Sequence, residues 1–219
     1  MDGRFEQILL AAAAELGIVI DRDRLALFET YRETLLLWNS RMNLVSLRSE
    51  VDLPVRHFID SFTLLPFLPS GGIRLLDIGS GAGFPSIPLK IFRPDLQVTL
   101  LEASRKKCSF LKEVIRKLAL KDIAVTHCRL EELLSQDASP VFDMIVSRAT
   151  FKMNELLERA FPLLGPGGIL AAMKGPGLEE ETGPLDTMKI QEFRILKDHS
   201  LTLPITGDRR RIILVDKPC

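Results

Sequence analysis

The sequence predicts a doubly wound α/β protein whose mostly parallel sheet carries a helical cap at its N-terminus. Three observations lead to this fold class. Strand-like and helix-like segments alternate from residue 73 onward, a glycine-rich turn follows the first of these strands, and residues 1–70 contain only helix-like segments. We therefore expect a cap over residues 1–70 and a sheet domain over residues 71–219.

The cap helices are predicted from apolar residues at helical spacing. Leu27, Tyr31 and Leu35, for example, recur every four positions with charged residues between them. The same periodicity predicts three helices in this part of the chain, at 4–16, 21–40 and 50–68. A Pro-Ser-Gly-Gly stretch at 69–72 then ends the cap, because proline and glycine interrupt regular structure.

The sheet domain is predicted from short apolar runs that alternate with amphipathic segments. Strands are expected at 73–78, 97–102, 123–127, 142–147 and 169–174, and helices at 85–92, 104–118 and 153–163. Two further runs, at 193–197 and 211–215, predict a final strand pair. Because Pro204 and Gly207 lie between these two runs, we expect the pair to include one antiparallel strand.

The segment Asp77-Ile78-Gly79-Ser80-Gly81-Ala82-Gly83-Phe84-Pro85 is the most informative part of the chain. An apolar strand ends in a carboxylate and opens into alternating glycines, which can bring the backbone close to a ligand at the carboxyl edge of a parallel sheet. A dinucleotide site requires G-x-G-x-x-G. When this motif is aligned with its first glycine at Gly79, the position of its third glycine holds Phe84. The carboxylate disfavours a phosphate and favours a cationic ligand such as S-adenosylmethionine, which carries an ammonium and a sulfonium.

A second acid at a strand end supports this ligand. The apolar run 98–102 ends in Glu102, at the spacing expected for a carboxylate that holds a ribose diol. The residues alone therefore predict cofactor contacts at Asp77, Gly81, Gly83 and Glu102. The alternative is a glycine-rich turn without a ligand, in which Asp77 caps the next helix and Glu102 is solvated.

The composition limits other classes of function. With 219 residues, 46% of them hydrophobic, the chain can bury a full core. Lys and Arg together number 29, as do Asp and Glu, so RNA affinity requires a local patch rather than an overall charge. Three cysteines without a C-x-x-C pair indicate a reducing compartment and predict no disulfide framework and no metal site. Acids flank the only apolar stretch near the N-terminus, so we expect a cytoplasmic protein without a membrane span.

An S-adenosylmethionine site predicts a methyltransferase, and the end of the fourth expected strand, read here over 143–149, should then meet the methyl acceptor. It lacks the Asn/Asp-Pro-Pro-aromatic turn of enzymes that methylate exocyclic base amines, and it lacks a Pro-Cys nucleophile for attack on a pyrimidine ring. Purine N7 has an in-plane lone pair and no proton to remove, so positioning beside the sulfonium suffices for its methylation. Lys152 and Lys174 leave methylation of a 2′-hydroxyl open.

Several motifs together resemble a known family. They are Trp38-Asn39 with Asn43-Leu44-Val45-Ser46, Arg56-His57-Phe58-Ile59-Asp60-Ser61, the glycine turn, Ser147-Arg148-Ala149 and Lys174-Gly175. On these residues most of the chain resembles the bacterial small-subunit ribosomal RNA guanine-N7 methyltransferases, also called glucose-inhibited division protein B. The resemblance implies a Rossmann-like class I S-adenosylmethionine-dependent methyltransferase, with residues 71–219 as its methyltransferase domain. It also implies methyl transfer to N7 of a guanine in the 530 loop of 16S rRNA.

The resemblance further implies cofactor contacts at five positions: Gly79, Phe84, Leu130, Glu131 and Arg148. The backbone amides of Leu130 and Glu131 are expected to face the adenine edge, because their loop lies beside that of the second strand. Equally open is that the acids at 131 and 132 only mark a helix N-terminus. The acid after the second strand is glutamate here, where the family also has aspartate, and its longer side chain can still reach the ribose.

Arg148 is expected to align the substrate, because a guanidinium at this edge can hold a phosphate or guanine O6. The alternative is a structural ion pair of Arg148 with Asp77 or Asp143. His57 and Asp60 lie one helical turn apart in the sequence, so they either shape the acceptor pocket or pin a helix to the core.

Contact with RNA is expected from two basic clusters. The first follows one helix face, and its members are Arg105, Lys106, Lys107, Lys112, Arg116 and Lys117. The second is the run Arg209, Arg210 and Arg211 beside the final strand. A solvated surface explains either cluster equally well. The expected partner is 16S rRNA or the small ribosomal subunit, and we expect a monomer without membrane association.

Other classes of function stay open. The nearest alternative is an S-adenosylmethionine-dependent methyltransferase that acts on another RNA, a protein or a small molecule. A nicotinamide-dependent oxidoreductase is disfavoured, because Phe84 breaks its fingerprint and no Tyr-x-x-x-Lys surrounds the single tyrosine, Tyr31. A non-catalytic RNA-binding protein is disfavoured because the glycine turn and both strand-end acids are present.

Overall fold

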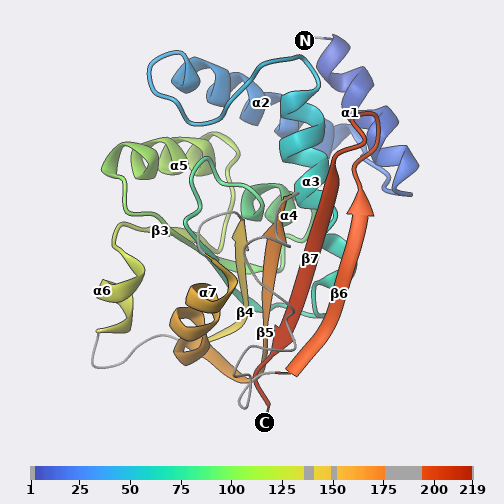
Figure 1. Ribbon diagram of the computed structural model, residues 1–219. Helices are drawn as coiled ribbons and strands as arrows, with labels where there is room; N and C mark the ends of the chain where they lie inside the picture. Colours follow the sequence, from blue (N-terminus) through green and yellow to red (C-terminus); the bar gives the residue numbers. More distant parts are fainter. Residues whose placement is uncertain (1–2, 136–140, 149–151, 176–193, 219) are drawn as a thin grey trace.

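The computed structural model describes residues 3–135, 141–148, 152–175 and 194–218. Within these ranges one sheet has the strand order β3-β2-β1-β4-β5-β7-β6 (Figure 1). The strands, in chain order, are β1 (Arg74–Ile78), β2 (Gln97–Leu101), β3 (Ile123–Thr126), β4 (Phe142–Arg148), β5 (Leu164–Lys174), β6 (Arg194–Thr202) and β7 (Arg209–Asp216).

The sheet confirms the predicted fold class. The pairs β1–β2, β1–β4, β2–β3 and β4–β5 are parallel, and β7 is antiparallel to both β5 and β6. The strand order reverses between β1 and β4, and in such sheets a ligand binds in the crevice at the carboxyl ends of these strands. Residue Phe193 of the expected final pair and Ala149 of the 147–149 motif lie outside the described residues.

The helices agree with the expected segments at most positions. The longer ones are α1 (Gly3–Glu15), α2 (Arg22–Asn39), α4 (Ser86–Phe92), α5 (Arg105–Lys117) and α7 (Met153–Ala160), followed by the short η3 (Phe161–Leu163). The helix expected at 50–68 is irregular, because it consists of a π-helix, one helical turn and a 3-10 turn: η1 (Pro54–Ile59), α3 (Asp60–Phe62) and η2 (Leu65–Phe67). Helix α6 (Leu130–Leu134) has five residues, too few to produce a recognisable apolar period.

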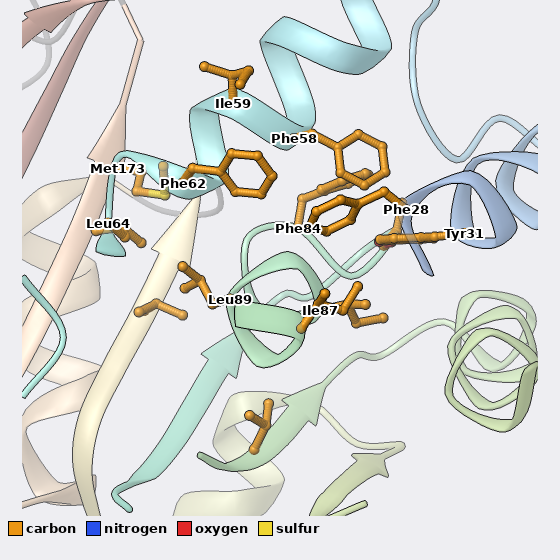
Figure 2. Close-up of a cluster of buried hydrophobic side chains, with 14 of the residues drawn as sticks. Phe28, Tyr31, Phe58, Ile59, Phe62, Leu64, Phe84, Ile87, Leu89 and Met173 are labelled. Atoms are coloured by element: carbon orange, nitrogen blue, oxygen red, sulfur yellow. The ribbon is translucent and has the colours of Figure 1, made fainter. Parts of the chain in front are cut away.

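The two faces of the sheet bury different apolar clusters. Because side chains alternate along a strand, Leu75 of β1 packs on one face and Leu76 on the other. The first cluster contains residues of α4, α5 and the cap helices, and the second contains residues of α6 and α7. Figure 2 shows the part of the first cluster where cap side chains such as Phe28 and Phe58 meet the glycine turn.

The cap therefore shares a continuous core with the sheet, and the division of the chain at residue 70 stays a prediction. No helix in the described ranges is long and apolar enough to cross a membrane.

Candidate active site

The glycine turn lies at the carboxyl end of β1, as the sequence predicts. Gly79, Gly81 and Gly83 have φ values of +73°, +57° and +88°, a region that glycine enters without steric penalty. The amides of Gly79 and Ser80 both donate to the carbonyl of Leu101, at 2.9 and 3.1 Å. The start of the turn is thus fixed against the end of the neighbouring strand β2.

Glu102 holds the middle of the same turn. Its Oε2 accepts from the amide of Gly81 at 2.9 Å, and its Oε1 accepts from the amide of Ser104 at 2.8 Å. The residue is buried, so the alternative in which Glu102 is solvated is wrong. Each carboxylate oxygen has two acceptor sites, so Glu102 can brace the turn and still accept from a ribose hydroxyl.

Asp77 is a buried carboxylate whose Oδ2 has no hydrogen-bond partner among the described residues. Burial raises the pKa of Asp77 to about 7, and the neighbouring Ser86 and Arg148 lower it only in part. A buried oxygen without a partner is unfavourable unless a ligand or water supplies one. A cationic group such as the ammonium of S-adenosylmethionine fits this position.

Phe84 and Gly83 face the cap rather than open space. The Phe84 ring is 2% exposed and lies 5.2 Å from the Phe58 ring and 5.1 Å from the His57 ring, centroid to centroid. At Gly83, an added Cβ would lie 2.5 Å from Cδ1 of Ile87. A cofactor contact at either residue therefore requires the backbone, and both contacts stay predictions.

The loop after β3 confirms one of the two interpretations that the sequence left open. Helix α6 begins at Leu130, and Glu131 lies in its first turn, so the helix N-terminus is confirmed. The Leu130 side chain is buried in the second core cluster, and the Glu131 carboxylate pairs with Arg159. Amides in a first helical turn have no acceptor within the helix, so they can face an adenine edge. That contact stays a prediction.

Arg148 ends β4 beside the turn. Its Nη2 lies 3.2 Å from Nδ1 of His57, and its Nη1 lies 3.4 Å from Oδ2 of Asp60. The guanidinium carbon is 5.4 Å from the centroid of the Phe84 ring. Asp143 is wrong as an ion-pair partner of Arg148, because it lies near the start of β4, at the opposite end of the strand, and pairs with Arg74 at 3.3 Å.

Asp60 pins the cap to the sheet, and a role of Asp60 and His57 in shaping the acceptor pocket stays a prediction. Asp60 is buried between Arg148 and Arg210, whose Nε donates to Oδ1 at 3.0 Å, so the cap helix is pinned to β4 and β7. Burial and the positive charge of Arg148 lower the pKa of His57 to about 3. His57 is therefore neutral at physiological pH, and both side chains also line a cleft.

This cleft has a volume of about 550 Å³ and opens where η1, β4, β5 and β7 meet. Its charged lining consists of five cations and two carboxylates: Arg48, Arg56, Arg148, Lys174, Arg210, Asp52 and Asp60. Arg48 and Asp52 were not predicted as site residues, because they lie just before η1 and belong to none of the motifs that the sequence offers. We refer to this feature as the acceptor cleft.

The two basic clusters differ in the structure. In α5, Arg105 and Lys106 are exposed on the surface. The run at 209–211 does not form one patch, because successive residues of a strand point to opposite faces. Arg210 pairs with Asp60, whereas Arg211 donates from Nε to Asp198 at 2.7 Å. Contact with RNA stays a prediction for both clusters.

Comparisons with known proteins identify the family. A family model described as rRNA small subunit methyltransferase G matches residues 24–207. The chain belongs to the rRNA small subunit methyltransferase G family. A relative named ribosomal RNA small subunit methyltransferase G, from Syntrophus aciditrophicus, is 44% identical over 210 residues, 94% of this chain and 87% of that protein. One of the same name from Geotalea uraniireducens is 38% identical over 221 residues, 99% of each chain.

Family membership confirms the resemblance on which the expected activity depends. A solved methyltransferase from Pyrococcus furiosus supports the fold, with a TM-score of 0.60 at 18% identity over 87% of this chain and 98% of that chain. The methyltransferase family and fold together imply use of S-adenosylmethionine, and the unpartnered Asp77 oxygen beside a glycine turn fits that cofactor. Among the described residues, no group of three or more His, Cys, Asp or Glu side chains can hold a metal ion.

Proposed function

We propose that this chain transfers a methyl group from S-adenosylmethionine to N7 of a guanine in the 530 loop of 16S rRNA. The observation that carries the proposal is the position of the acceptor cleft. Arg148 and His57 line this cleft and also contact the Phe84 ring of the glycine turn. A base in the cleft therefore lies next to the predicted cofactor site.

Groups at the carboxyl ends of β1 and β2 would hold the cofactor. When bound, S-adenosylmethionine supplies a methyl group on a positively charged sulfur. Asp77 would accept from its ammonium, and Glu102 from its ribose hydroxyls, while the turn that Glu102 braces brings the backbone close. Because Asp77 is buried, its attraction for the ammonium would be less weakened by water than at the surface.

The residues at the acceptor side suit a nucleophile that has no proton to lose. His57 is neutral, and its Nδ1 is occupied by the Arg148 guanidinium, so this histidine is poorly placed to act as a general base. N7 of guanine needs no base, and it reacts once it is aligned. Arg148 can supply the alignment by donating to O6 or to a phosphate.

The charge of the acceptor cleft suits RNA. The lining of the cleft holds five cations and two carboxylates, and Asp208 beside it pairs with Arg56 at 2.6 Å, so cations still outnumber carboxylates there although the chain as a whole is formally neutral. Such a local excess attracts phosphates without drawing the protein to every polyanion. The proposal includes a cytoplasmic, monomeric protein that acts on 16S rRNA or on the small ribosomal subunit.

The test is methyl transfer from labelled S-adenosylmethionine to 16S rRNA from cells that lack the modification, supplied as free RNA and as subunit. Label at one guanine of the 530 loop, mapped by borohydride and aniline cleavage, is the expected result. A matched RNA with 7-deazaguanine at that position lacks the acceptor atom and should take up no label. Label that persists in the deaza RNA, or that enters only other RNAs, proteins or small molecules, contradicts the proposal.

A further inference from the structure

Tyr31 connects the cap to the glycine turn. It lies on α2, is fully buried, and its Oη donates to the carbonyl of Ala82, between Gly81 and Gly83. Fifty-one residues separate Tyr31 from Ala82 in the sequence, so this contact depends on the folded chain. The cap therefore reaches the loop that is proposed to bind the cofactor.

The aromatic ring of Tyr31 also supports the turn. It stacks on the ring of Phe84, with centroids 5.2 Å apart and planes inclined by 18°, and it meets Phe58 edge-on at 5.3 Å. Figure 2 shows Tyr31, Phe84 and Phe58 grouped beside Ile87 of α4. The stack fixes Phe84, which immediately follows the last glycine of the turn.

Gly83 shows how closely the turn is fitted to the tyrosine hydroxyl. A Cβ at Gly83 would lie 2.8 Å from Oη of Tyr31, closer than such atoms come in folded proteins. The backbone of the turn can therefore approach the hydroxyl only because this position has no side chain.

The turn is held from two opposite sides. Glu102, from the end of β2, accepts from the amide of Gly81, and Tyr31, from the cap, donates to the carbonyl of Ala82. These are adjacent residues, so the peptide between them is restrained at both ends. Loss of either restraint frees the same short segment of backbone.

We propose that Tyr31 is a positioning residue for the cofactor, holding the glycine turn in its binding conformation through the hydroxyl. This inference depends on the proposed function, because it assumes that the turn binds S-adenosylmethionine. Tyr31 itself touches the turn and not the ligand. The cap then forms part of the cofactor site.

The test replaces Tyr31→Phe, which keeps the stacked ring and removes only the hydroxyl. Thr34→Val is the matched control, because Thr34 is also buried on α2 and its Oγ1 donates to Thr30 at 2.8 Å, away from the turn. Calorimetric titration with S-adenosylhomocysteine is expected to show binding about tenfold weaker for Tyr31→Phe, the loss of one buried hydrogen bond, and unchanged for Thr34→Val.

A second measurement needs no ligand. Hydrogen exchange at the amides of residues 79–83 should be faster in Tyr31→Phe than in wild type, and unchanged in Thr34→Val. The inference is overturned if Tyr31→Phe and wild type have equal affinity and equal exchange. It is also overturned if Thr34→Val loses as much affinity as Tyr31→Phe. If wild-type protein binds no S-adenosylhomocysteine and no S-adenosylmethionine, the proposed function itself fails, and the inference fails with it.

Discussion

Arg148 Nη2 lies 3.2 Å from Nδ1 of His57, and this hydrogen bond joins the end of β4 to the π-helix of the cap. Arg148 is the donor, because a guanidinium has no acceptor. Nδ1 of His57 is therefore unprotonated, which agrees with a His57 pKa lowered to about 3 by burial and by the charge of Arg148. The contact requires a neutral histidine.

The stability that His57 contributes should decrease as the pH is lowered. Below the unfolded pKa of about 6.5, the unfolded chain binds a proton that the folded chain, with its pKa near 3, does not bind. The contribution is complete above pH 6.5 and declines toward pH 3. The excess unfolding free energy of wild type over His57→Gln should shrink by about 2 kcal/mol between pH 8 and pH 5 in urea titrations. A difference that does not change with pH would contradict a neutral His57.

Asp77 should show the opposite dependence. Its pKa is raised to about 7, so the folded chain holds a proton that the unfolded chain, with a pKa near 3.9, releases. The stability linked to this proton is complete below the unfolded pKa and is lost as the pH rises through 7. The unfolding free energy of Asp77→Asn minus that of wild type should therefore increase by about 3 kcal/mol from pH 5 to pH 8, measured without cofactor.

The same substitution should weaken cofactor binding, because the amide gives up the charge that attracts an ammonium. Stability and affinity are thus expected to move in opposite directions in Asp77→Asn, measured by urea unfolding and by calorimetry. An amide that destabilises the free protein at pH 8 would show that the interactions of the Asp77 carboxylate with Ser86 and Arg148 outweigh the cost of its burial.

Asp60→Asn should be strongly destabilising. The carboxylate lies between Arg148 and Arg210, both mostly buried, and its loss removes the charge that faces Arg148 and leaves Arg210 with the more distant carboxylate of Asp208, at 3.9 Å. Breaking a buried ion pair by removing one partner typically costs about 3 kcal/mol or more, and urea unfolding measures this loss. Methyl transfer should also fall at temperatures where the variant is folded, because Arg148 loses this ion pair and keeps the weaker hold of its hydrogen bonds to His57 and to the Arg56 carbonyl. Asp143→Asn is the control, since its pair with Arg74 is exposed, and little change is expected there.

The sequence was sufficient for the sheet and for the glycine turn, because both depend on local patterns. Each of these patterns can be recognised within a few residues of sequence: the alternating apolar runs, Asp77 at a strand end, and the glycines at fixed spacing. The acceptor cleft was only partly predictable. Asp60 meets Arg148 and Arg210 across 88 and 150 residues of sequence, and no periodicity encodes such contacts.

Tyr31 illustrates the same limit. Its spacing with Leu27 and Leu35 predicts a buried position on a cap helix, which the structure confirms. The contact of its hydroxyl with Ala82 depends on how the cap packs on the sheet. Likewise, the run of arginines at 209–211 suggested a patch, but the alternation of a β-strand gives Arg210 and Arg211 different partners.

Gly83→Ala should be more destabilising than Gly71→Ala. Both glycines have similar positive φ, +88° and +81°, so the backbone strain of alanine is about 1 kcal/mol at each. A Cβ at Gly71 meets nothing within 4 Å, whereas at Gly83 it lies 2.5 Å from Cδ1 of Ile87. The clash should add about 2 kcal/mol, measured as the difference between the two unfolding free energies. Equal losses would show that Ile87 moves aside freely.

The basic residues of α5 and of the acceptor cleft should contribute separately to RNA binding. Lys106→Gln with Lys107→Gln removes two charges from α5, and Arg48→Gln removes an exposed charge from the cleft. The slope of log K against log salt is negative, and each lost phosphate contact should reduce its magnitude by about 0.7 to 0.9. Filter binding to 16S rRNA over a salt series measures the slope, and calorimetry with S-adenosylhomocysteine should show unchanged cofactor affinity in every variant. A slope equal to wild type in the α5 variant identifies that helix face as solvated surface, and the same result for Arg48→Gln moves the phosphate contacts to the other cations of the cleft.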